Sequence, residues 1–322
     1  MNLRSGVVFA NAFVLSIETI FVESLTAVLQ ISPLTVAAIT TPLAGGMLIF
    51  IVAVIIKDKI TVFRSWRHLL PGSAFMALGI ITWYDAVSKI GASKEATLTG
   101  PLEATVVLFL AWFFLKERLS KVQLIGAMIA IIGIFATAMS GRGTLEAFSS
   151  SVYLFTGGDL EAILSAVAFA VAIIFLAKLV RFHSAIQVAG ASLFVSGLIL
   201  AGFQVGYYFA IPTVQEWDLL LLYSFLPLIG ALLYSMSLRK VGASITSIIA
   251  SSAYLMTIAT QLVLSALGFK TILPENIALL VVGGLLGLLG IGLIYKDTII
   301  VSFRRLSLEF EQGVVRRERR DE

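Results

Sequence analysis

Two six-residue stretches, SKIGAS at residues 88–93 and RKVGAS at residues 239–244, decide the fold of this 322-residue chain. Each lies where one apolar run ends and the next begins, and residue 239 follows residue 88 by 151 positions. A pair of glycines seven residues apart also recurs, first as Gly126 and Gly133 and then as Gly283 and Gly290. These recurrences indicate that the chain is built from two similar halves.

The composition is that of a membrane protein. Hydrophobic residues make up 59% of the chain and charged residues 13%, with a mean hydropathy of +1.00, whereas soluble domains are about 45–50% apolar and about 25% charged. Runs of about 20 apolar residues predict membrane-spanning helices. We expect an all-α polytopic protein with ten spans, near 7–29, 34–56, 69–90, 93–115, 120–139, 159–180, 184–208, 217–237, 243–266 and 276–295.

The basic residues predict the orientation. Of the 23 Lys and Arg residues, 19 fall in one set of alternating segments, and only Lys89, Lys94, Arg142 and Lys270 fall in the other. Because basic residues stay on the cytoplasmic side, both termini should be cytoplasmic, in a multi-pass protein of the plasma membrane. Since five is odd, the second half must be inverted, as in many secondary transporters. The expected organisation is a first repeat at 1–140, a linker at 141–158, a second repeat at 159–295 and a cytoplasmic tail at 296–322.

One stretch resembles a known family. Pro101, the sequence LKERL at 115–119, Gln123 and the glycines at 126 and 133 look like the signature of the EamA-like branch of the drug/metabolite transporter superfamily. The second copy is degraded, because its equivalents of Pro101 and Glu117 are Ser252 and Gly268. The resemblance implies a ten-helix carrier of small metabolites or drugs, in which helices 1–4 and 6–9 line a central cavity and helices 5 and 10 lie outside it.

Four acidic residues lie deep in the predicted spans: Glu18, Glu23, Asp85 and Glu103. A carboxylate at the bilayer centre costs about 2.5–3.5 kcal/mol on insertion scales, so such residues usually face a cavity and bind a proton or a cation. Glu103 is the strongest candidate, with Thr99 one turn away on the same face. The alternatives are a protonated Glu that hydrogen-bonds between helices and, for Asp85, an ion pair with Lys89 at i+4.

The predicted ninth span carries hydroxyl and amide groups instead of acids. Ser251, Tyr254 and Gln261 follow helical spacing, and the offset of 151 aligns Glu103 with Tyr254. In an inverted repeat the two should face each other across the cavity, the acid binding an amine while Tyr254 supplies a ring and a hydroxyl. The alternative is close packing against a neighbouring helix. Six aromatic residues near span ends are interpreted as interfacial anchors: Trp66, Trp83, Tyr84, Tyr207, Tyr208 and Trp217.

Other functions find little support. The chain has no cysteine, only two histidines and no P-loop, so we expect no enzyme activity, no metal and no cofactor. The sequence pI of 9.3 reflects charges facing the inner membrane surface rather than nucleic-acid binding. The glycines of the last span predict close helix packing or a homodimer contact.

We therefore predict a secondary transporter of small polar or cationic metabolites or drugs that works by alternating access, with proton coupling as one option. Its partners would be a small-molecule substrate and the lipid bilayer. Two alternatives are a non-transporting membrane scaffold and an intramembrane aspartyl protease. The protease reading rests on Tyr84-Asp85 and Gly157-Gly158-Asp159, although Asp159 fits better as a first-turn acid of a helix.

Overall fold

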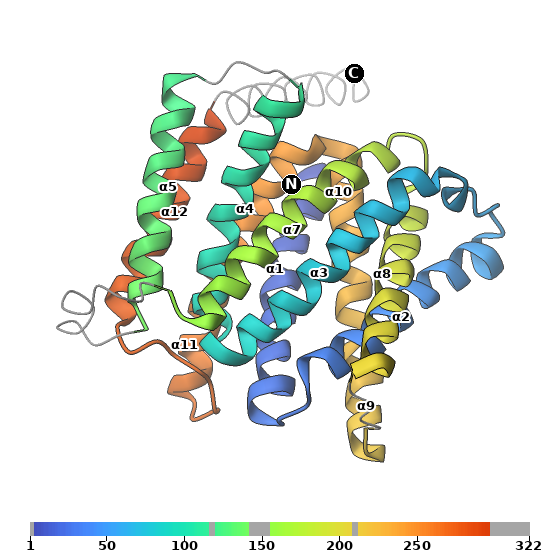
Figure 1. The fold of residues 1–322 in the computed structure, drawn as a ribbon, viewed down its shortest axis with the longest axis horizontal. Coiled ribbons are helices and arrows are strands. Elements are labelled where there is room, and N and C mark those ends of the chain that lie inside the picture. Colours follow the sequence, from blue (N-terminus) through green and yellow to red (C-terminus); the bar gives the residue numbers. More distant parts are fainter. Residues whose placement is uncertain (1–2, 116–119, 142–154, 208–211, 297–322) are drawn as a thin grey trace, which may run out of the picture.

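The computed structural model describes residues 3–115, 120–141, 155–207 and 212–296, and these residues form helices and no strand (Figure 1). The first half contains α1 (Leu3–Glu23), α2 (Pro33–Phe50), α3 (Trp66–Ile90), α4 (Ala92–Leu115) and α5 (Lys121–Met139), with short π-helical segments at Ser24–Val28 and Ile51–Ile56 and a 3-10 turn at Val62–Ser65. The second half contains α7 (Gly157–Leu179), α8 (Ala185–Tyr207), α9 (Val214–Tyr223), α10 (Phe225–Ser251), α11 (Ala253–Ala266) and α12 (Ile277–Ile294).

Seven helical segments among the described residues are long and apolar enough to cross a membrane. The predicted spans at 69–90, 93–115 and 243–266 are not among them. The first two correspond to α3 and α4, and the third is divided between the end of α10 and the short helix α11. The predicted linker and tail fall largely outside the described residues.

Local sequence signals set where several helices begin. Three helices start with a capping box, in which a Ser or Thr side chain and the side chain three residues later satisfy each other's backbone N–H groups. The pairs are Ser120 with Gln123 for α5, Thr156 with Asp159 for α7, and Thr213 with Glu216 for α9. The predicted first-turn role of Asp159 is therefore confirmed.

The repeated sequence motif folds into the same turn twice. Gly91 has φ 80° and ψ 159°, and Gly242, 151 residues later, has φ 83° and ψ 173°. This region of backbone space is essentially restricted to glycine. Gly91 joins α3 to α4 as a single residue, and Gly242 divides α10 into two helical parts. The recurrence in the sequence thus extends to the backbone conformation.

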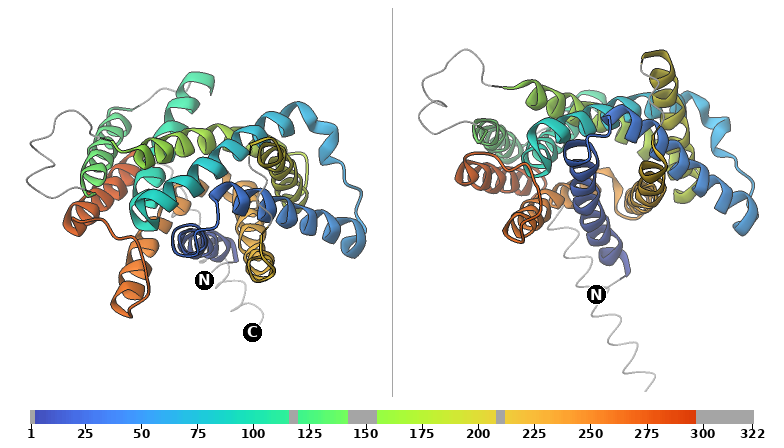
Figure 2. Two further views of the ribbon diagram at one scale, coloured as in Figure 1. Left: turned by 60° about the horizontal axis from the view of Figure 1, so that its bottom comes forward. Right: turned by 90° about the horizontal axis from the view of Figure 1, so that it is seen from below.

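The helices pack in pairs, with one helix of each pair from the first half of the chain and one from the second half. Helix α3 lies along α7, α1 along α10, α2 along α8, and α4 along α11. Helices α5 and α12 form a separate pair at one edge of the bundle in every view (Figures 1 and 2). Each of these contacts joins an element of the first half to one of the second, so neither half has a core of its own.

The predicted glycine pairs of the two halves contact each other. A Cβ atom on Gly126 would lie 2.7 Å from the carbonyl oxygen of Gly290, and one on Gly133 would lie 2.7 Å from that of Gly283. Side chains at these positions would collide with backbone atoms, which cannot rotate away. The glycines therefore allow α5 and α12 to approach closely within one chain.

Candidate functional site

A cavity of about 190 Å³ lies among the helices of both halves. Its walls come from α1, α2, α3 and α4 in the first half and from α7, α8, α10 and α11 in the second, whereas α5 and α12 contribute none of its lining residues. Most of the lining side chains are apolar. The polar lining groups are Ser, Thr and Tyr hydroxyls and three carboxyl groups, Glu18, Glu95 and Glu103, and the lining residues include no Lys, Arg or His.

Glu18 is held on one side of this cavity by a chain of hydroxyl groups. It lies on α1 and is 4% exposed. The Tyr223 hydroxyl donates a hydrogen bond to its carboxyl group, and the Tyr223 and Tyr84 hydroxyls lie 2.8 Å apart. Gly230 on α10 faces the carboxyl group closely, because a Cβ there would lie 3.1 Å from Oε2 of Glu18. The lack of a side chain at Gly230 therefore leaves room beside Glu18.

Glu103 and Glu95 lie two turns apart on α4 and differ in their surroundings. Glu95 is 1% exposed and accepts hydrogen bonds from Nε1 of Trp83, at 3.1 Å, and from the hydroxyl of Thr99. Glu103 has no hydrogen-bond partner among the described residues. The Thr99 hydroxyl thus donates to Glu95 and not to Glu103, and a binding role for Thr99 beside Glu103 stays a prediction. A ligand entering the cavity would meet Glu103 with both oxygens available.

Tyr254 and Ser251 line the same cavity as Glu103 but are also used in packing. The Tyr254 hydroxyl donates to the carbonyl oxygen of Gly284 on α12 at 2.8 Å, and Ser251 donates to that of Gly100 at 3.0 Å. The Tyr254 hydroxyl thus donates to the backbone in this structure, and its role in ligand binding stays a prediction. What Tyr254 presents to the cavity is the face or edge of its ring.

Glu23 and Gln261 do not line the cavity. Oε2 of Glu23 accepts hydrogen bonds from the backbone N–H of Ala92, at 2.6 Å, and from Nε2 of Gln261, at 2.5 Å. Oε1 of Glu23 accepts a hydrogen bond from the backbone N–H of Ile272 at 2.6 Å. The sequence suggested a proton- or substrate-binding role for both side chains, whereas the structure commits them to each other and to backbone groups.

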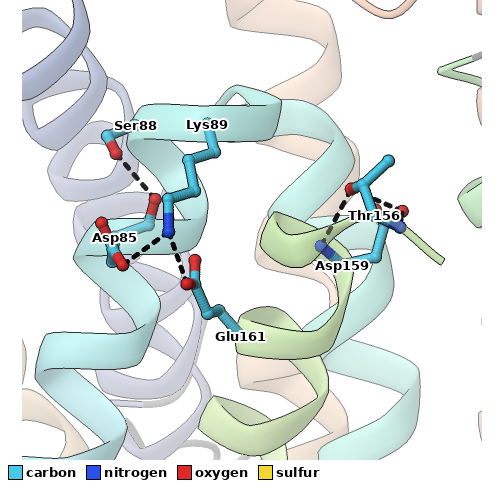
Figure 3. Close-up of polar contacts among 6 residues, drawn as sticks. All are labelled: Asp85, Ser88, Lys89, Thr156, Asp159 and Glu161. Atoms are coloured by element: carbon cyan, nitrogen blue, oxygen red, sulfur yellow. Dashed lines mark hydrogen bonds and ion pairs between the residues drawn. The ribbon is translucent and has the colours of Figure 1, made fainter.

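Asp85 also lies outside the cavity and forms an ion pair. Its Oδ2 is 2.8 Å from Nζ of Lys89, which also contacts Glu161 at 2.5 Å (Figure 3). The i,i+4 pair weighed in the sequence analysis is therefore confirmed. Asp159 is fully buried and pairs with Lys94 at 2.8 Å. Because each aspartate has its own cation, the two do not form the shared dyad that an aspartyl protease requires.

The sequence analysis missed several residues of the cavity wall. Trp83 and Tyr84 are not interfacial anchors: both line the cavity, and Tyr84 is 1% exposed. Their spacing from Met76 and Ile80, which also line it, is that of one helix face, so this periodicity was available in the sequence. Tyr234, on α10, also lines the cavity, and its buried hydroxyl has no hydrogen-bond partner within the part of the chain that the structure describes.

The comparison with family models identifies one family. The model of the EamA-like transporter family matches the chain twice, over residues 4–139 and 156–296. The Bacillus subtilis (strain 168) protein described as uncharacterized transporter YetK is 28% identical over 166 residues, a segment that spans 48% of this chain and 48% of that protein. A crystal structure of a protein covers 91% of this chain and 99% of its own, with a TM-score of 0.61 at 16% identity, which shows a shared fold.

The two matches of the family model together cover most of the chain, and the family is one of transporters rather than enzymes. The resemblance stated from Pro101, the LKERL stretch and the spaced glycines is confirmed. The apolar helices long enough to span a bilayer fit this assignment. The chain therefore belongs to the EamA-like transporter family and is a multi-pass membrane transporter of the drug/metabolite kind.

Proposed function

We propose that this chain is a secondary carrier that moves small cationic or polar metabolites or drugs across the plasma membrane by alternating access. The observation that carries the proposal is the cavity lined by Glu18, Glu95 and Glu103 with no basic residue among its lining side chains. A cleft lined by charge of one sign concentrates ligands of the opposite sign, and low-dielectric walls strengthen this effect. Intramembrane carboxyl groups that face a cavity are typical of ion and substrate paths.

The organisation that we propose is ten spans in two inverted five-helix repeats, at 1–140 and 159–295, with both termini cytoplasmic. In such a repeat, α1 to α5 correspond in order to α7, α8, α10, α11 and α12. Exchanging corresponding helices turns the α3–α7 pair into the α10–α1 pair and leaves the pairs α2–α8, α4–α11 and α5–α12 unchanged. The shared conformation of Gly91 and Gly242 supports the same relation. A cavity between inverted repeats is where secondary transporters place their substrate site.

The substrate that fits this cavity has a cationic group attached to an apolar or aromatic body. Glu103 supplies a carboxyl group with no competing partner among the described residues. The rings of Trp83, Phe169 and Tyr254 supply apolar surface and cation–π contacts. The hydroxyls of Tyr234 and Thr41, which have no hydrogen-bond partner in the described ranges, could hydrogen-bond a polar group on the substrate.

Proton coupling follows from the same carboxyl groups in our proposal. A Glu in the cavity binds either a proton or the cationic substrate, so binding of one releases the other. The exchange takes place on each side of the membrane in turn, as the cavity opens to that side. Glu18 and Glu103 are the residues proposed to exchange the proton. This mechanism needs no nucleotide.

Uptake into proteoliposomes tests the proposal. A panel of organic amines and neutral polar metabolites would be assayed with and without a pH gradient, for the wild-type chain and for Glu103→Gln and Glu18→Gln. We expect both variants to lose gradient-driven uptake of a cationic substrate and to retain substrate counterflow to a larger extent. The matched control is Glu161→Gln, which removes a carboxyl group outside the cavity. Unchanged gradient-driven uptake in both cavity variants would rule out the proposed roles.

A further inference from the structure

We propose that Glu23 and Gln261, with the backbone groups of residues 92, 93 and 272, form an outer latch that keeps the cavity closed toward the outside. This inference rests on the proposed function, because it assigns the two side chains a positioning role in the transport cycle. They would act by setting the side to which the cavity opens, without touching the substrate.

The latch joins three cavity-lining helices at one end of the bundle. Glu23 is the last residue of α1, Ala92 and Ser93 begin α4, and Gln261 lies on α11. Besides its bond to Glu23, Gln261 accepts a hydrogen bond from the N–H of Ser93 at 2.9 Å and donates one to the carbonyl oxygen of Ile272 at 3.0 Å. Two side chains thus bind together α1, α4, α11 and the segment after α11.

The position of these contacts relative to the cavity makes them a closure. Glu95 and Ala96 line the cavity. The latched residues Ala92 and Ser93 lie about one turn before them, at the start of α4. Glu23 and Gln261 are 2% and 0% exposed, so no open path reaches them in this state. In the proposed topology, this end of the bundle faces the outside.

The chemistry of the latch suits a contact that opens and closes. The Glu23 carboxylate occupies the N-terminal end of α4, where free N–H groups and the helix dipole favour an anion. Hydrogen bonds of this kind exchange with water at small net cost when a site becomes wet. The glycine contacts between α5 and α12 bring backbone against backbone, so they suit a permanent seam instead.

The test uses cysteine labelling, because the chain has no cysteine of its own. Ala231→Cys places a thiol on the cavity wall, and a membrane-impermeant maleimide is applied to the outer face of intact cells. Adding Glu23→Ala or Gln261→Leu should raise the labelling rate at least about tenfold, the change that losing one hydrogen bond to a buried charged group brings. Gln204→Ala is the matched control, since it removes a buried amide of α8 that donates a hydrogen bond to Thr35 on α2.

Two further measurements separate a latch from a merely structural contact. Thermal unfolding in detergent shows whether each variant is folded, and Gln261→Leu, which keeps the volume and leaves Glu23 its backbone donors, guards against a Glu23 variant that does not fold. Labelling that stays unchanged in both folded variants, or that rises equally in Gln204→Ala, would overturn the latch. Substrate uptake by the wild-type chain is measured in parallel. If the wild-type chain takes up substrate but the labelling rate of the latch variants is unchanged, only the latch is refuted. If the wild-type chain takes up no substrate, the proposed function is refuted.

Discussion

The buried ion pair between Lys94 and Asp159 should be one of the most sensitive points of the fold. Lys94, near the start of α4, and Asp159, in the first turn of α7, have side chains that are 3% and 0% exposed. Asp159 Oδ2 already accepts hydrogen bonds from the Thr156 backbone and side chain, and Oδ1 has Lys94 as its counter-ion at 2.8 Å. Replacing Lys94 by Met keeps the apolar stem and leaves Oδ1 without a partner.

The expected loss is set by burial. Removing one partner of a buried ion pair leaves an uncompensated charge and costs about 3–5 kcal/mol. Lys89, five residues earlier, also has a carboxylate at 2.8 Å, but its side chain is 46% exposed. An exposed pair contributes about 0–1 kcal/mol. Lys94→Met should therefore lower the melting temperature by on the order of 10 °C, and Lys89→Met by a few degrees at most.

Thermal unfolding of the purified protein in detergent measures both effects. The double variant Lys94→Met/Asp159→Asn should recover most of the loss, because Asn keeps the capping oxygen and removes the charge. Equal melting temperatures for Lys94→Met and Lys89→Met would refute the reasoning, as would a double variant that is no more stable than Lys94→Met alone.

Three further predictions concern the seam, the cavity and the response to pH. Gly133→Val should destabilise the protein by more than about 2 kcal/mol, because its Cβ would lie 2.7 Å from the Gly283 carbonyl, whereas Gly292→Ala, with nothing within 4 Å, should be neutral in the same melting assay. Gly230→Val should crowd Glu18 and weaken binding of a cationic substrate about tenfold in transport kinetics without a matching loss of stability; unaltered KM would contradict it. Burial lowers the pKa of His183 below its ordinary value of 6.5, and its ring lies 3.1 Å from the Thr61 hydroxyl and 2.8 Å from that of Ser65. As the pH falls, the unfolded chain takes up the proton before the folded protein does. The contribution of His183 to the free energy of unfolding is therefore present above pH 6.5 and is lost as the pH drops below it. His183→Gln should remove this part of the pH dependence from melting temperatures measured between pH 5 and 7.5.

The sequence was sufficient for features that depend on periodic patterns. Apolar runs predicted most of the helices, and the recurrence at an offset of 151 located the two special glycines, Gly91 and Gly242. The same offset aligned Glu103 with Tyr254, and both line one cavity. These predictions rest on properties that recur along the chain, which a single sequence displays directly.

What the sequence could not supply is the partner of each polar group. Glu23 is bound by backbone N–H groups of residues 92 and 272, and any residue other than proline offers such a group. Thr99 lies four residues from both Glu95 and Glu103 on one helix face, and in the structure it donates to Glu95, whose other oxygen accepts from Trp83. Such choices depend on distances between helices, which no pattern within one helix contains.

The one-residue turn at Gly91 has a mechanical consequence. A connection of a single residue keeps the adjoining ends of α3 and α4 together, whatever the angle between the two helices. Trp83 on α3 and Glu95 on α4 lie on opposite sides of this turn and are hydrogen-bonded to each other. In the proposed transport cycle, this second link across the turn is expected to move the Trp83 ring and the Glu95 carboxyl group together.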